Sequence, residues 1–199
     1  MKPIHLHNGN PVTRNHTSTR LYALSESGMP KGNGLPKDLL EIAKYLNPAI
    51  SARYGHTFNN SITYVYDFCY LAGAYLPRVW WRNVLEPDPQ RIIDMNVQTV
   101  YDWLIDFGHD FGWREVSDTR HAQELAEIGH VVVIIALPKK PSFTGGLSVV
   151  LPEDKAMFNP PAKDTSIPHQ TSSGKLYFRT DWYKGKRNKE FKLYVNYMK

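Results

Sequence analysis

The most informative hydrophobic pattern in the chain lies between residues 59 and 81, where polar residues precede a periodic apolar run. Asn59, Asn60 and Ser61 come first, and residues that suit a buried face then recur at three- and four-residue steps: Ile62, Val65, Tyr66, Cys69, Tyr70 and Gly73. Asn and Ser cap helix N-termini, and this spacing is typical of a helix with a buried face. We expect a helix whose N-terminus meets solvent at Ser61 and which ends at Pro77, because proline cannot continue a helix.

Three other segments have the pattern of short helices. Residues 38–46, DLLEIAKYL, are mostly apolar and end before Asn47 and Pro48. Residues 96–107 place apolar side chains on one helical face, and Gly108 then supplies a stop. A third helix is predicted after Asp118 or Thr119, with AQELAEI as its body and Gly129 as its end.

The second half of the chain predicts strands. HVVVIIAL, at residues 130–137, is a continuous run rich in β-branched residues, as expected for a strand buried on both faces. Residues 146–152, GLSVVLP, follow after a short loop, which favours an antiparallel pair. KLYFRTDWY and EFKLYVNYM alternate polar with apolar residues and predict a C-terminal hairpin around KGKRNK. The fold class predicted from these segments is α+β.

Composition supports one domain. The chain is 199 residues long and 42% hydrophobic, enough for one sizeable core. Residues 1–36 show no periodicity and predict a loop-rich arm, so residues 37–199 are the expected domain. We expect no membrane span and no signal peptide, because no apolar run is long enough for either. The expected location is the cytoplasm, or the outside by a non-Sec route such as phage lysis or a contractile secretion system.

Metal and cofactor sites are not expected. The single Cys excludes an internal disulfide and a cysteine-rich zinc site. His5 and His7 form an H-x-H pair, but no Cys or carboxylate cluster accompanies them.

The order of a capped helix, further helices and two glycine-led strands resembles bacterial cell-wall hydrolases of the NlpC and CHAP kind, which have a papain-like fold. In those relatives a Cys opens the buried helix, where the helix N-terminus favours a thiolate, and a His follows on a strand. Ser61, in SITYVYD, stands where that Cys is expected. Gly129-His130-Val131 is similar to the first strand, and the run from Gly145 to Val150 to the second, which puts Gly146 at the position of the His.

The resemblance extends from about residue 50 to the end of the chain, and it implies a peptidoglycan peptidase or amidase scaffold that has lost its nucleophile and its base. It also implies a groove beside the helix, bounded by Asn60, Ser61, Tyr64, Trp80, Trp81 and Trp113. Gln170 lies in HQTSSG, which is similar to a Gln-Ser-x-Ala-Gly-like stretch of some relatives. There it would orient a ligand amide; the alternative is a loop Gln that faces water.

Two catalytic alternatives remain open from the sequence. The first pairs Cys69 with His130, although Cys69 lies about 12 Å further along the helix than Ser61 and sits among apolar residues that raise a thiol pKa. The second uses Ser61 as nucleophile with His56 or His169 as a base from a loop.

Charge adds one more hypothesis about partners. The formal net charge is +5, and in residues 179–199 Lys and Arg outnumber Asp181 and Glu190 by the same amount. This basic segment could contact nucleic acid, anionic wall polymers or an acidic protein, although no nucleic-acid recognition motif is present. We therefore expect a catalytically inactive hydrolase-like protein that binds a wall peptide or a protein partner. The alternatives are an active wall amidase or peptidase and a basic nucleic-acid-binding protein.

Overall fold

The structure, a computed structural model, describes residues 30–51, 53–54, 60–81, 92–140, 145–154, 168–178 and 189–197. The expected α+β class is confirmed. The described part of the chain contains a six-stranded sheet in which every neighbouring pair is antiparallel. In sheet order its strands are β3 (Trp113–Val116), β8 (Lys189–Asn196), β4 (Val131–Pro138), β5 (Gly146–Val150), β6 (Gln170–Ser172) and β7 (Lys175–Phe178).

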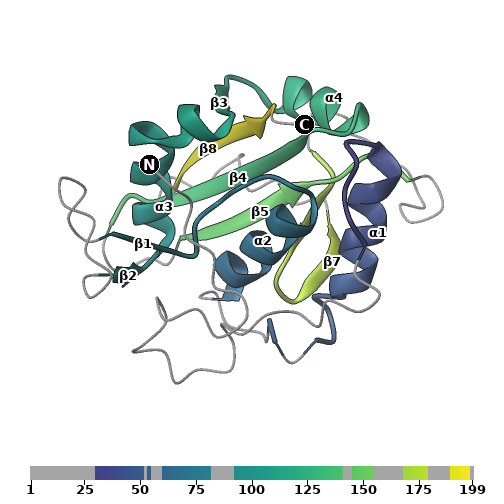
Figure 1. Cartoon of the computed structure of the whole chain (residues 1–199), viewed down its shortest axis with the longest axis horizontal. Coiled ribbons are helices and arrows are strands. Elements are labelled where there is room, and N and C mark those ends of the chain that lie inside the picture. The colour runs from purple at the N-terminus through teal and green to yellow at the C-terminus, as the bar shows by residue number, and fades with distance from the viewer. Residues whose placement is uncertain are drawn as a thin grey trace.

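Helices pack on both faces of this sheet. On one face lie α1 (Pro36–Leu46), α2 (Asn60–Leu71) and α3 (Val97–Asp106), which appear in front of the strands in Figure 1. The other face is covered by α4 (Thr119–Glu127). Successive side chains of a strand point to opposite faces, so Val133 and Ile135 join the first core and Val132 and Ile134 join the second. The prediction that residues 130–137 form a strand buried on both faces is confirmed.

Local signals set the ends of most helices. Asn96 forms a capping box with Thr99 at the start of α3, and the Asp118 side chain accepts from the His121 N–H at the start of α4. The start of α1 is Pro36, two residues earlier than predicted, which suits proline at a first helical position. The helix α2 ends at Leu71 rather than Pro77, and this prediction was wrong. Its end is set by Gly73, whose φ of +80° continues no right-handed helix.

The predicted C-terminal hairpin is also wrong. Strand β7 pairs with β6 at one edge of the sheet, whereas β8 pairs with both β4 and β3 on the other side. Strands β7 and β8 are therefore not neighbours: β7 is the edge strand beside β6, and β8 lies between β3 and β4. Residues 179–188 lie outside the described part.

A second, two-stranded sheet follows α2. It pairs β1 (Val79–Trp81) with β2 (Ile92–Asp94) in antiparallel register. After α3, a short 3₁₀ helix, η3 (Gly108–Phe111), leads into β3. This part of the chain forms an aromatic cluster in the core, made of Tyr75, Trp80, Trp103, Phe107 and Phe111.

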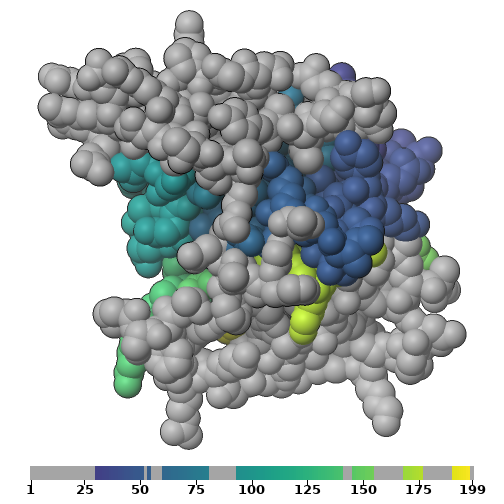
Figure 2. Space-filling view, turned by 90° about the horizontal axis from the view of Figure 1, so that it is seen from below, coloured from purple at the N-terminus to yellow at the C-terminus, as the bar shows by residue number. Residues whose placement is uncertain are grey.

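The first described residues pack on the domain. The Gly32 N–H donates to the Leu71 carbonyl at 2.8 Å, so residues 30–35 lie against the end of α2. Residues 1–29 of the expected arm lie outside the described part. Figure 2 shows α3, in teal, beside α1 and α2, in purple to blue, with yellow-green atoms of residues 168–178 next to α2. Among the described helices, none combines the length and the hydrophobicity that a membrane crossing requires.

Candidate functional site

Ser61, in the first turn of α2, lies against the start of β5. Its Oγ accepts a hydrogen bond of 3.2 Å from the Leu147 N–H, across 86 residues of sequence. Leu147 directly follows Gly146, so the structure brings together the two positions that the resemblance pairs as nucleophile and base. Gly146 carries no side chain. Ser61 is only 4% exposed, so the prediction that it meets solvent was wrong.

The chemistry available at this point is limited. A serine nucleophile needs a base that removes its proton, and glycine offers none. His169 has its Nε2 3.2 Å from Glu153 Oε1, and the His130 ring packs edge-on against Tyr197 at 5.0 Å. His56 lies outside the described residues. The described contacts thus engage both of these imidazoles with other partners.

Polar side chains join α2 to strands β5 and β6 next to Ser61. The Tyr64 hydroxyl and Thr171 Oγ1 share a hydrogen bond of 2.7 Å, and both groups are buried. On β5, the Ser148 hydroxyl donates to Gln170 Oε1 at 2.9 Å. The Ser172 hydroxyl donates to the Leu147 carbonyl at 2.7 Å. These bonds satisfy groups that burial would otherwise leave without water, so the cluster stabilises the fold.

Two residues predicted to bind a ligand belong to this buried cluster. Tyr64 and Gln170 have no exposed surface, and both hydrogen-bond inside the protein. Gln170 also donates from Nε2 to the Pro168 carbonyl at 3.4 Å, so it is not a loop Gln that faces water. Asn60, the first residue of α2, is buried as well.

The tryptophans expected to bound a groove are core residues. Trp80 is 4% exposed and stacks edge-on with Trp103 at 5.5 Å. Trp113 is 1% exposed, and its Nε1–H donates to the Tyr75 carbonyl at 2.6 Å. Neither lies on a groove wall in this structure. Trp81 belongs to β1, and its side chain lies outside the described part.

The alternative nucleophile, Cys69, is fully enclosed in α2. Burial raises the pKa of its thiol well above the ordinary value, so the thiol stays protonated at neutral pH. A protonated, inaccessible thiol is not a nucleophile. The ring of His130 packs against Tyr197. The geometry therefore offers no support for a Cys69–His130 dyad.

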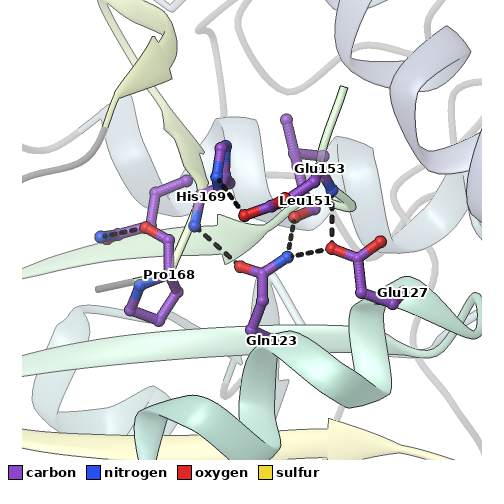
Figure 3. Close-up of polar contacts among 7 residues, drawn as sticks. Gln123, Glu127, Leu151, Glu153, Pro168 and His169 are labelled. Carbon is purple, nitrogen blue, oxygen red and sulfur yellow. Dashed lines mark hydrogen bonds and ion pairs between the residues drawn. The ribbon is translucent and has the colours of Figure 1, made fainter. Parts of the chain in front are cut away.

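A polar network on α4 was missed by the sequence reasoning, which named His169 only as a possible base (Figure 3). The Gln123 amide receives the His169 N–H at 2.9 Å and donates to the Leu151 carbonyl at 2.8 Å. Its Nε2 also donates to Glu127, whose Oε1 accepts from the Glu153 N–H at 2.7 Å. Gln123 thus extends the β5–β6 pairing with a side chain. The only sequence signal was a Gln on the apolar face of a helix, four residues before a Glu.

A largely buried ion pair holds Arg53 and Tyr54 against α2. Asp67 accepts from Arg53 Nε at 2.6 Å and Nη2 at 3.0 Å, and from the Tyr54 hydroxyl at 2.9 Å. Hydrogen bonding and charge attraction from Asp67 raise the pKa of Arg53 despite its burial. These contacts hold Tyr54 against the Tyr64 ring at 5.1 Å.

No group of three or more His, Cys, Asp and Glu side chains suited to a metal ion occurs within the described ranges. His5 and His7 lie outside them. No protein-family model matches this sequence, and no curated protein matches it closely enough to count as a relative.

Proposed function

We propose that this chain is a non-catalytic protein with the architecture of papain-like cell-wall hydrolases, and that it acts by binding a wall peptide or a protein partner. The α+β class is established; the papain-like arrangement belongs to the proposal. It rests on element order, with a buried helix that is followed by an antiparallel sheet and whose first turn contacts the second glycine-led strand.

The observation that carries the proposal is the hydrogen bond between Ser61 Oγ and the Leu147 N–H, one residue from Gly146. In the resembling hydrolases these places hold a thiolate and an imidazole. Here a buried hydroxyl instead accepts from a backbone N–H at the start of a strand. That contact helps to hold α2 on the sheet. Neither position supplies a reactive group.

The buried cluster around Ser61 affects where a partner would bind. Tyr64 and Gln170 have no exposed surface, so their part in this account is to hold α2 on the sheet. Contacts with a partner then come from side chains at the protein surface. This favours recognition of an external surface or chain end over insertion of a substrate bond beside Ser61.

Purified sacculi test both halves of the proposal. Co-sedimentation with sacculi measures wall binding, and release of soluble wall fragments measures hydrolysis. We expect no fragment release by the wild type above that of Ser61→Ala, and retention on sacculi or on a protein from the same cells. Release by the wild type that disappears in Ser61→Ala or in Cys69→Ala would contradict the absence of catalysis.

A further inference from the structure

A pocket of about 510 Å³ lies at the opposite end of α2 from Ser61. The twelve residues of α2 separate the two places by roughly 17 Å along the helix axis. The volume falls within the range of small-molecule binding sites. Its lining combines segments distant in sequence and includes Gly32, Gly34, Gly73, Ile128, Gly129 and His130.

Two helices end at this pocket, and they end in the same way. After α2, Gly73 has a φ of +80° and the Ala74 N–H donates to the Cys69 carbonyl at 2.8 Å. After α4, Gly129 has a φ of +95° and the His130 N–H donates to the Leu125 carbonyl at 3.0 Å. Both are Schellman-type endings with glycine in the left-handed conformation.

The segment before α1 bridges these two endings. The Gly32 N–H donates to Leu71 at the end of α2, and the Gly34 carbonyl lies against the Cα of Gly129 beyond α4. A Cβ on Gly129 would meet that carbonyl oxygen far inside contact distance. A Cβ on Gly34 or Gly73, in contrast, would meet nothing within 4 Å, as expected for glycines that face an opening.

The pocket is rich in acceptors. Each helix C-terminus carries about half a negative charge from its aligned peptide dipoles. Most backbone N–H groups of the lining already donate hydrogen bonds within the protein. These are the N–H groups of Gly32, Asn33, Ala72, Gly73, Gly129 and His130. No described residue donates to the carbonyl oxygens of Ala72, Gly73, Ile128 and Gly129. Among the described residues that line the pocket, none is Lys, Arg, Asp or Glu.

Two exposed apolar side chains lie at or beside the pocket. Ile128, which lines it, is 64% exposed. Tyr197 is 45% exposed and packs edge-on against His130. Exposed large apolar residues gathered at a pocket mark a binding site more often than residues scattered singly.

We propose that this pocket binds an organic cation, a primary ammonium or guanidinium group attached to an apolar chain. The cationic group donates to the carbonyl oxygens at the ends of α2 and α4, and the chain lies against Ile128 and Tyr197. From the described lining residues, an anion would receive neither a positively charged Lys or Arg nor an array of unused N–H donors. The site is independent of the Ser61 region, and its existence does not depend on whether the chain binds cell wall.

A titration of the full chain with three pentyl compounds tests the charge preference. Pentylammonium, 1-pentanol and pentanoate share one apolar chain and differ in the head group. We expect pentylammonium to shift the backbone amide resonances of Gly73, Gly129 and His130, with an affinity that falls as salt increases. Equal binding of pentanoate, or no shift with pentylammonium at any concentration, overturns the proposal.

Substitutions at two exposed positions place a charge beside the pocket or away from it. Ile128→Lys should weaken pentylammonium binding about tenfold by like-charge repulsion at short range, and Ile128→Glu should strengthen it. Ile105→Lys, on α3 at a residue that is 54% exposed, should change nothing. Both positions are exposed, so we expect the variants to fold like the wild type. Unchanged binding in Ile128→Lys overturns the site.

A lysine-containing tripeptide amide, with its lysine free or acetylated, then distinguishes the source of the cation. Preference for the unacetylated peptide over pentylammonium identifies a peptide ligand. Equal affinities identify a free amine.

Discussion

Tyr64 and Thr171 lie 107 residues apart in sequence and share a buried hydrogen bond of 2.7 Å between their hydroxyl groups. The bond joins α2 to the short strand β6. It is one of the contacts that hold the first turns of α2 on the sheet. Tyr64→Phe should lower the free energy of unfolding by about 1–2 kcal/mol, because Thr171 then keeps only its longer bond to Lys175. Urea unfolding measures the loss.

Tyr45→Phe is the matched control for this substitution. Tyr45 is on the exposed side of α1, so loss of its hydroxyl should leave the unfolding midpoint unchanged. Equal effects of the two substitutions would argue against a stabilising Tyr64–Thr171 bond.

Breaking the Arg53–Asp67 pair should lower the free energy of unfolding more than removing the Tyr64 hydroxyl does. Asp67→Asn removes the charge that neutralises Arg53 and weakens the acceptor for the Tyr54 hydroxyl. We expect a loss of about 3 kcal/mol, in the range found when one partner of a largely buried pair is removed. Thermal unfolding of Asp67→Asn, and of the exposed Asp102→Asn as control, checks this. A loss below that of Tyr64→Phe would contradict it.

Alkaline pH should destabilise the protein through buried tyrosines. Burial raises the pKa of Tyr194 to about 12 and raises the pKa of Tyr54 as well. Unfolded tyrosine ionises near pH 10, so above that pH the unfolded state releases a proton that the folded state keeps. The stability is therefore full below about pH 10 and is lost as pH rises towards the folded pKa.

The slope of this loss should be about 1.4 kcal/mol per pH unit for each such tyrosine. Tyr194→Phe should make the loss between pH 10 and pH 12 smaller, as measured by denaturant unfolding at each pH. The same slope in wild type and variant would show that Tyr194 is not one of the groups responsible.

Gly129 should tolerate a side chain much less well than Gly34, although both have positive φ. Alanine at either position should lower the free energy of unfolding by about 1–2 kcal/mol, because the backbone there is left-handed. At Gly129 the new Cβ also collides with the Gly34 carbonyl, whereas at Gly34 it meets open space. We expect the loss in Gly129→Ala to exceed the loss in Gly34→Ala by at least 1 kcal/mol, as roughly estimated for a contact that the backbone must move to relieve. Similar losses would place residues 32–34 away from α4.

Local patterns in the sequence identified most helices and the central strand pair. The polar caps Asn96 and Asp118 act through bonds within a few residues, so the starts of α3 and α4 follow from the sequence alone. The apolar run from Val131 also needs no partner to be read as a buried strand, because only burial on both faces accommodates it.

Strand partners and burial of amphipathic residues are decided by distant contacts, and there the sequence misled. Alternating patterns at Lys175 and Lys189 both predict strands, but nothing local indicates that β8 lies between β3 and β4. Trp80 and Trp113 suit a groove wall as well as a core. Trp113 packs in the core, where its Nε1–H is satisfied by the Tyr75 carbonyl, 38 residues away.

The candidate site was only partly predictable for the same reason. The pairing of Ser61 with the start of β5 followed from a family resemblance. The pocket at the ends of α2 and α4 depends on two glycines. The sequence predicted Gly129 as a helix end, but it placed Gly73 inside a helix that was expected to continue to Pro77. Their proximity depends on how α2 and α4 pack on the two faces of the sheet.

The most direct test of the central claim, a hydrolase architecture without a reactive pair, compares the wild type with Ser61→Ala on purified sacculi. Both proteins are incubated with sacculi, and soluble wall fragments are measured. The account predicts the same background release from both, because Ser61 is buried and Gly146 offers no base. Release by the wild type that disappears in Ser61→Ala would contradict it.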